Sequence, residues 1–60
     1  MLTAEAKLAS VERELGYRKR VYPRLVADHR MKQDNADYEI GVFEAIAADY
    51  RREAEKERLL

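Results

Sequence analysis

The segment YRKRVYPRL, residues 17–25, holds the densest group of side chains able to bind a charged ligand in this 60-residue chain. It contains four cationic side chains and two tyrosines. A helix that begins before this segment and continues through Pro23 would place three arginines and one tyrosine of residues 13–24 within about 60° of one another. This set, here called the arginine row, is Arg13, Tyr17, Arg20 and Arg24. Guanidinium groups in such a row bind phosphates or carboxylates through forked hydrogen bonds, and the tyrosine ring offers a stacking surface for a base.

The arginine row has three possible roles at the level of sequence. It can bind a nucleotide or nucleic acid. Together with Tyr22 it can instead bind another protein, because Tyr and Arg dominate the energetics of protein interfaces. In the third interpretation it has no ligand: the arginines pair with acids of a neighbouring helix or only solubilise an exposed face.

Residues able to catalyse a reaction are scarce. The chain has no cysteine, its only non-tyrosine hydroxyls are Thr3 and Ser10, and Ser10 is far in sequence from His29, the single histidine. Catalysis needs a nucleophile, or an acid and a base, held together in a pocket. The composition excludes a Cys/His zinc site, and the Glu-x-x-His pattern of helical carboxylate sites is absent. We therefore expect no enzymatic activity, no metal site and no cofactor.

Charge is balanced over the whole chain but not along it. Twelve Lys and Arg residues offset twelve Asp and Glu residues. Residues 13–32 carry seven bases and two acids, a local +5, whereas residues 33–60 carry eight acids and four bases, a local −4. The two parts can neutralise each other, and no overall excess attracts nucleic acid or membrane. With no apolar run of ~20 residues and no signal-like amino terminus, we expect a soluble cytoplasmic protein.

The first half of the chain predicts a helix over about residues 3–29. Its apolar residues recur at steps of three and four, and Thr3 suits the N-cap position. Pro23 disturbs this pattern, because it has no N–H to donate to the Lys19 carbonyl and disfavours helical geometry at the preceding residue. We expect a kink or a break there, or Pro23 in the first turn of a short separate helix.

The second half predicts a turn at about 29–33 and a helix over about 33–56. The expected architecture is an all-α helical hairpin, a single domain over residues 1–60. Val42 and Ile46 widen the apolar face of the second helix to roughly 160°, more than one neighbouring helix covers. We therefore expect hairpins to assemble into a dimeric helical bundle or a higher homo-oligomer. The predicted core and oligomer contacts are Leu8, Val11, Leu15, Ile40, Val42, Phe43, Ile46, Ala47 and Tyr50.

Arg18 falls inside the apolar stripe of the first helix, between Val11 and Tyr22 in angle. A partly buried guanidinium needs an acidic partner. The candidate partners are Glu14 one turn back and Glu39, Glu44 or Asp49 opposite. We expect the pair to fix the register of the hairpin.

Several short motifs of the chain form a recognisable series. They are VYPRLV at 21–26, Met31, Ala36, EI at 39–40 and EAIAADYR at 44–51. The series resembles a family of small uncharacterised proteins of phages and prophages of Gram-negative bacteria, with a VYPRWV-like segment, a Gly-Lys-Met turn and an A..EI…EAI..DY helix. The resemblance covers roughly residues 10–51. Leu25 stands where the family commonly has tryptophan, and His29-Arg30 where it tends to have Gly-Lys.

These observations predict a non-enzymatic helical interaction protein that binds a host or phage protein stoichiometrically. The resemblance implies a phage-encoded accessory or host-inhibiting, anti-defence factor in the host cytoplasm. Two alternatives stay open: binding of a nucleotide or nucleic acid through the arginine row, and a structural role in the virion or its assembly.

Overall fold

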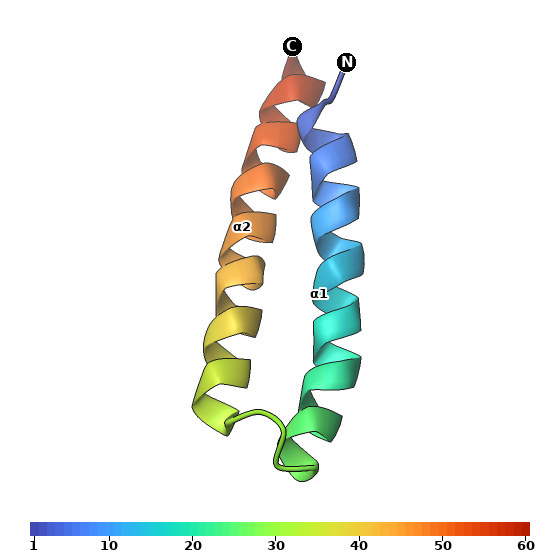
Figure 1. Ribbon diagram of the computed structural model, residues 1–60. Coiled ribbons are helices and arrows are strands. Elements are labelled where there is room, and N and C mark those ends of the chain that lie inside the picture. The colour runs from blue at the N-terminus through green and yellow to red at the C-terminus, as the bar shows by residue number, and fades with distance from the viewer.

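Two antiparallel helices joined by a short turn form the fold in this computed structural model, which describes residues 1–60 (Figure 1). Helix α1 spans Ala4–Ala27 and helix α2 spans Gln33–Leu59. Both termini lie at one end and the turn at the other, and the molecule is a rod of 48 × 16 × 14 Å. The predicted all-α helical hairpin is confirmed. Neither helix has the length and apolar content needed to span a lipid bilayer.

The start of α1 is fixed by two side chains. Thr3 is the N-cap, as its position predicted, and its hydroxyl accepts a hydrogen bond from the Ala6 N–H at 3.0 Å. The Ala4 N–H donates to both carboxylate oxygens of Glu57, at 3.2 and 3.3 Å. These bonds satisfy two of the backbone donors that a helix leaves free at its first turn. The end of α2 is thereby tied to the start of α1.

Helix α1 runs through Pro23 without interruption to Ala27, so the predicted break and the separate short helix are both wrong. No kink is shown there either. The φ angle that proline imposes is itself helical, so its cost is one missing hydrogen bond and local crowding near the last turn. Tyr22, Leu25 and Val26 flank the proline and are all half-buried, so packing holds the turn in place.

His29 ends α1 by adopting a conformation that glycine usually supplies. Its φ is 60°, in the left-handed region, just after the C-cap residue Asp28. The His29 N–H donates to the Val26 carbonyl at 3.0 Å, and the Arg30 N–H donates to the Leu25 carbonyl at 2.8 Å. This pair of bonds is the Schellman motif, which satisfies carbonyls at the end of a helix.

Helix α2 begins at Gln33, as predicted, and continues to Leu59, three residues beyond the predicted end. Ala54 is buried against α1, which gives the last turns a packed side. Intrahelical ion pairs of Lys56 with Glu53 and of Arg58 with Glu55 lie along the same turns. Such pairs stabilise helices by a few tenths of a kcal/mol each, ~0.2–0.5.

The interface between the helices has alanines at its centre. The only buried residues are Ala4, Ala36, Ala47 and Ala54. Small side chains at these points let the two backbones approach closely, while larger side chains lie at the edges of the contact. Of the predicted core residues, Ala47 is buried and the other eight are half-buried: Leu8, Val11, Leu15, Ile40, Val42, Phe43, Ile46 and Tyr50. The single hairpin therefore shields no large apolar side chain fully.

Candidate functional site

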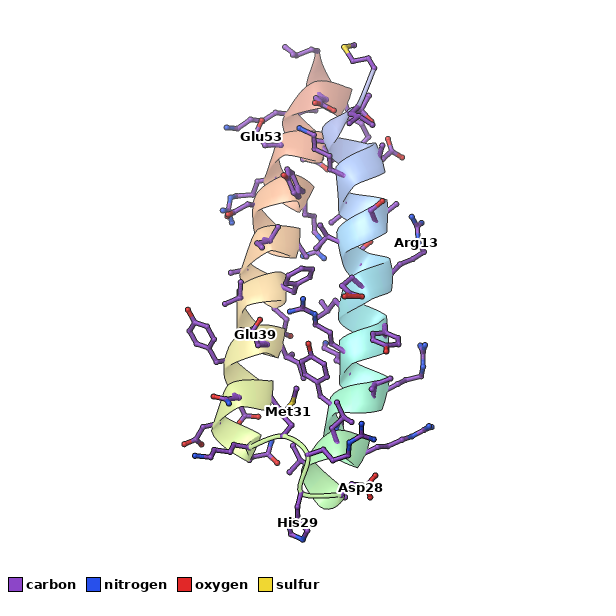
Figure 2. All side chains as sticks on the ribbon, in the orientation of Figure 1. Arg13, Asp28, His29, Met31, Glu39 and Glu53 are labelled. Carbon is purple, nitrogen blue, oxygen red and sulfur yellow. The ribbon has the colours of Figure 1, made fainter.

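The arginine row lies along the side of α1 that faces away from α2. All four of its members are exposed, and Tyr17 keeps 49% of its surface accessible. Arg13 points outward from the hairpin (Figure 2). Its Nη2 donates a hydrogen bond to the Ser10 hydroxyl at 3.1 Å. The continuous helix through Pro23 keeps Arg24 in line with the rest of the row.

Ion pairing divides the cations of the chain into two groups. The four cations of α2 all pair with carboxylates, as Arg51 does with Glu12 at 3.1 Å. Arg18 and Lys19 in α1 are also paired. None of the three arginines in the row reaches an acid within the hairpin. The guanidinium groups of the row therefore have no charged partner within the hairpin.

Further cations extend the positive surface to the turn. Arg30 and Lys32 are exposed and make no ion pair within the chain. They border an open hollow with His29, Met31 and Asn35. The positive surface thus runs from the outward side of α1 to the end of the rod.

Tyr22 was predicted to act together with the arginine row, but it lies apart from it. It is half-buried, and its ring centre is 5.8 Å from the guanidinium carbon of Arg18. That arginine faces α2, whereas the row faces away from it. The structure therefore brings Arg13, Tyr17, Arg20 and Arg24 onto one surface and places Tyr22 at the helix interface.

Arg18 is partly buried and acid-paired, as predicted. Its side chain is 15% exposed, and its Nη1 is 3.3 Å from a Glu39 carboxylate oxygen and 3.1 Å from the Glu39 carbonyl. Its Nε is 3.6 Å from Glu14. The guanidinium also stacks on Phe43, 3.7 Å from the ring centre, a contact that the sequence did not predict. The contacts with Glu39 and Phe43 join the two helices, so Arg18 has a structural role in the hairpin.

Groups for covalent chemistry do not converge. The Ser10 hydroxyl bonds Arg13, while His29 lies at the tip of the turn (Figure 2). No three metal-ligating side chains cluster. One shallow groove lies between the helices and is lined mainly by ion-paired side chains, among them Lys19 and Glu44 at 3.4 Å. What the surface offers is a set of hydrogen-bond donors on a rigid helix.

Two further contacts across the hairpin were not predicted from the sequence. Lys7 lies over the Tyr50 ring at 5.6 Å, and Glu57 caps the start of α1. Both contacts join residues that are far apart in the chain. The sequence shows the charged residues Lys7 and Glu57, but their partners depend on how the two helices are aligned along each other. No family model, curated protein or solved structure matches this chain.

Proposed function

We propose that this chain is a non-enzymatic helical interaction protein. It works as a homo-oligomer of hairpins and binds an acidic surface of another protein stoichiometrically through the arginine row. The observation that carries the proposal is the division of the cations: the arginines of the row have no acid within the hairpin, whereas every cation of α2 has one.

The dimensions of the row favour a macromolecular ligand. Arg13 and Arg24 are eleven positions apart, about 16 Å along a helix axis, which exceeds the size of one small anion. Arginine and tyrosine together are enriched at the energetic centres of protein interfaces, and Tyr17 is exposed among the arginines. An acidic partner would also be attracted and oriented by the local positive field.

Affinity capture from a bacterial lysate, treated with nuclease, tests this function. The variant Arg20→Glu/Arg24→Glu is compared with wild type and with Arg52→Glu/Lys56→Glu, which makes the same charge change on α2. We expect one protein to be retained by wild type and control and lost by the row variant. With the purified partner, the loss in affinity should be about 30-fold or more, equivalent to about 2 kcal/mol. Equal capture by all three baits contradicts the proposal.

Binding of a nucleotide or nucleic acid is the second candidate, because the same free guanidinium groups fit phosphates and Tyr17 can stack on a base. Its signature is salt dependence: affinity for a labelled single-stranded oligonucleotide falls steeply between 50 and 200 mM salt, roughly by powers of ten. Removing one phosphate-binding arginine should lower the slope of log affinity against log salt by about one. A slope that Arg20→Ala leaves unchanged removes the row from nucleic-acid binding.

The phage-type motifs suggest the setting of this function. In an infected bacterium, a small protein that occupies a host surface would act in the cytoplasm as an accessory or host-inhibiting, anti-defence factor. A structural role in the virion is the competing setting. Mass spectrometry of purified particles separates the two, because a structural component is present there at high copy.

A further inference from the structure

The two sides of the contact between the helices differ in chemistry. One side, the polar seam, is crossed by the ion pairs of Lys19 with Glu44 at 3.4 Å and of Arg51 with Glu12 at 3.1 Å. The side chains of these pairs are each 50% or more exposed, so the polar seam is in contact with solvent.

The opposite side has apolar residues beside the partly buried Arg18. Here Arg18 stacks on Phe43 and pairs with Glu39. Residues three and seven positions after Arg18 on α1, and after Glu39 on α2, fall on the same side as these contacts. They are Val21 and Leu25 on α1, and Val42 and Ile46 on α2. All four are half-buried, and with Phe43 they form what we call the apolar seam.

The surface of the lone hairpin is larger than its mass accounts for. Its accessible area is 4806 Å². A compact folded protein of 7.1 kDa exposes roughly 4,100 Å². The excess of about 700 Å² is close to the ~800 Å² that each partner contributes to a standard protein interface. Burial of about 800 Å² of each hairpin in an interface would remove this excess.

The charges determine which helix can lie over which. Helix α1 carries six bases and three acids, a net +3, and helix α2 carries four bases and eight acids, a net −4. Two copies packed with α1 over α1 would bring like charges together, whereas α1 over the other copy's α2 brings opposite charges together. A two-fold axis along the rod gives the second arrangement and makes all neighbouring helices antiparallel, as in common four-helix bundles.

We propose that a second copy of this chain docks on the apolar seam, with each α1 lying over the partner's α2. This rests on the homo-oligomer proposed above and names its surface. Within one hairpin, level residues have numbers that add up to about 60, as Arg18 with Phe43 and Lys7 with Tyr50 show. Because a two-fold axis along the rod leaves the height of each residue unchanged, the same rule holds between the two copies. Val21 of one copy therefore lies beside Val42 of the other. The arginine row stays on the outside, free for its own ligand.

Sedimentation equilibrium of wild type, Ile46→Glu and Ala45→Glu tests the surface. Ala45 is exposed on the same turn of α2, so the control adds the same charge outside the seam. We expect wild type and Ala45→Glu to be dimers and Ile46→Glu to dissociate at least 100-fold more readily. A dimeric Ile46→Glu variant overturns this docking surface but leaves a homo-oligomer in place. A folded, monomeric wild type overturns both. These results do not depend on whether the arginine-row variant Arg20→Glu/Arg24→Glu loses the captured protein, so the two proposals can fail separately.

Cross-linking keeps the proposal testable if Ile46→Glu fails to fold. Val21→Cys and Val42→Cys proteins are mixed and oxidised, and disulfides form only where Cα atoms come within about 7 Å. We expect a mixed 21-to-42 product well above that from Val21→Cys with Ala45→Cys. A dominant 21-to-21 product would place α1 over α1, and equal yields with the control would remove the seam from the interface; either overturns the proposal.

Discussion

At the scale of single residues, His29 is the position with a measurable conformational cost. It is the only non-glycine residue with positive φ, at 60°. Left-handed geometry costs most L-residues roughly 1 kcal/mol, and glycine avoids this cost. We expect His29→Gly to raise the free energy of unfolding by about 1 kcal/mol and His29→Val to lower it, both measured by urea denaturation. A destabilised glycine variant would show that the imidazole makes a compensating contact.

Arg18 shows why a guanidinium is needed at the helix interface. It stacks on Phe43 at 3.7 Å and donates to the Glu39 carbonyl at 3.1 Å. A lysine ammonium keeps the charge but loses the planar stack and the forked donors. We expect Arg18→Lys to cost about 1 kcal/mol of stability. The same change at Arg20, which is exposed on the same helix, should stay within about 0.5 kcal/mol. Equal effects at both positions would contradict a structural role for the stack.

At the scale of elements, the contact between Glu57 and the start of α1 joins the two ends of the chain. The acceptor lies 53 positions from the Ala4 N–H that it binds. A carboxylate at a helix N-terminus satisfies a free donor and interacts favourably with the helix dipole. We expect Glu57→Ala to lower the free energy of unfolding by about 0.5–1 kcal/mol and to increase amide exchange in the first turn of α1. Glu55→Ala, which removes an exposed intrahelical pair, is the matched control and should leave that exchange unchanged.

Pro23 lies within the continuous helix α1, and its effect on the stability of that helix can be measured. An interior proline costs a helix up to ~3 kcal/mol relative to alanine. Because Pro23 lies one turn from the end of α1, we expect Pro23→Ala to stabilise the chain by about 1–3 kcal/mol. Thermal unfolding followed by circular dichroism measures the change. A less stable alanine variant would mean that the proline ring itself makes a necessary contact.

Local signals predicted the elements well and their contacts less well. The apolar periodicity predicts two helices, and their first residues, Ala4 and Gln33, lie within one residue of the predicted starts. Pro23 was misjudged as a break because a local rule ignores the packing of the residues around it. In the candidate site, the outward position of the arginine row follows from helical spacing alone. The absence of acidic partners for these arginines could not be predicted from helical spacing. It depends on which carboxylates lie near them once the two helices are aligned.

At the scale of the whole molecule, the hairpin has little to stabilise it alone. Its only fully buried residues are four alanines, and its larger core side chains stay partly exposed. Ordering each residue costs about 1–2 kcal/mol in backbone entropy, so a chain of this size needs further support. There are no cysteines to provide disulfides. Covering the apolar seam with a second copy would supply that support, and folding and association would then be one equilibrium.

Coupled folding and association make the melting temperature depend on protein concentration. For a dimer that unfolds to separate chains, a hundredfold higher concentration adds about 2.7 kcal/mol in favour of the folded state. Over a 120-residue dimer this corresponds to a rise of about 10 °C. We expect this rise for wild type and for Ala45→Glu between 2 and 200 µM, measured by circular dichroism, and none for any folded fraction of Ile46→Glu. A wild-type melting temperature that does not move across this range would mean that the two helices suffice on their own, and it would contradict the proposed dimer.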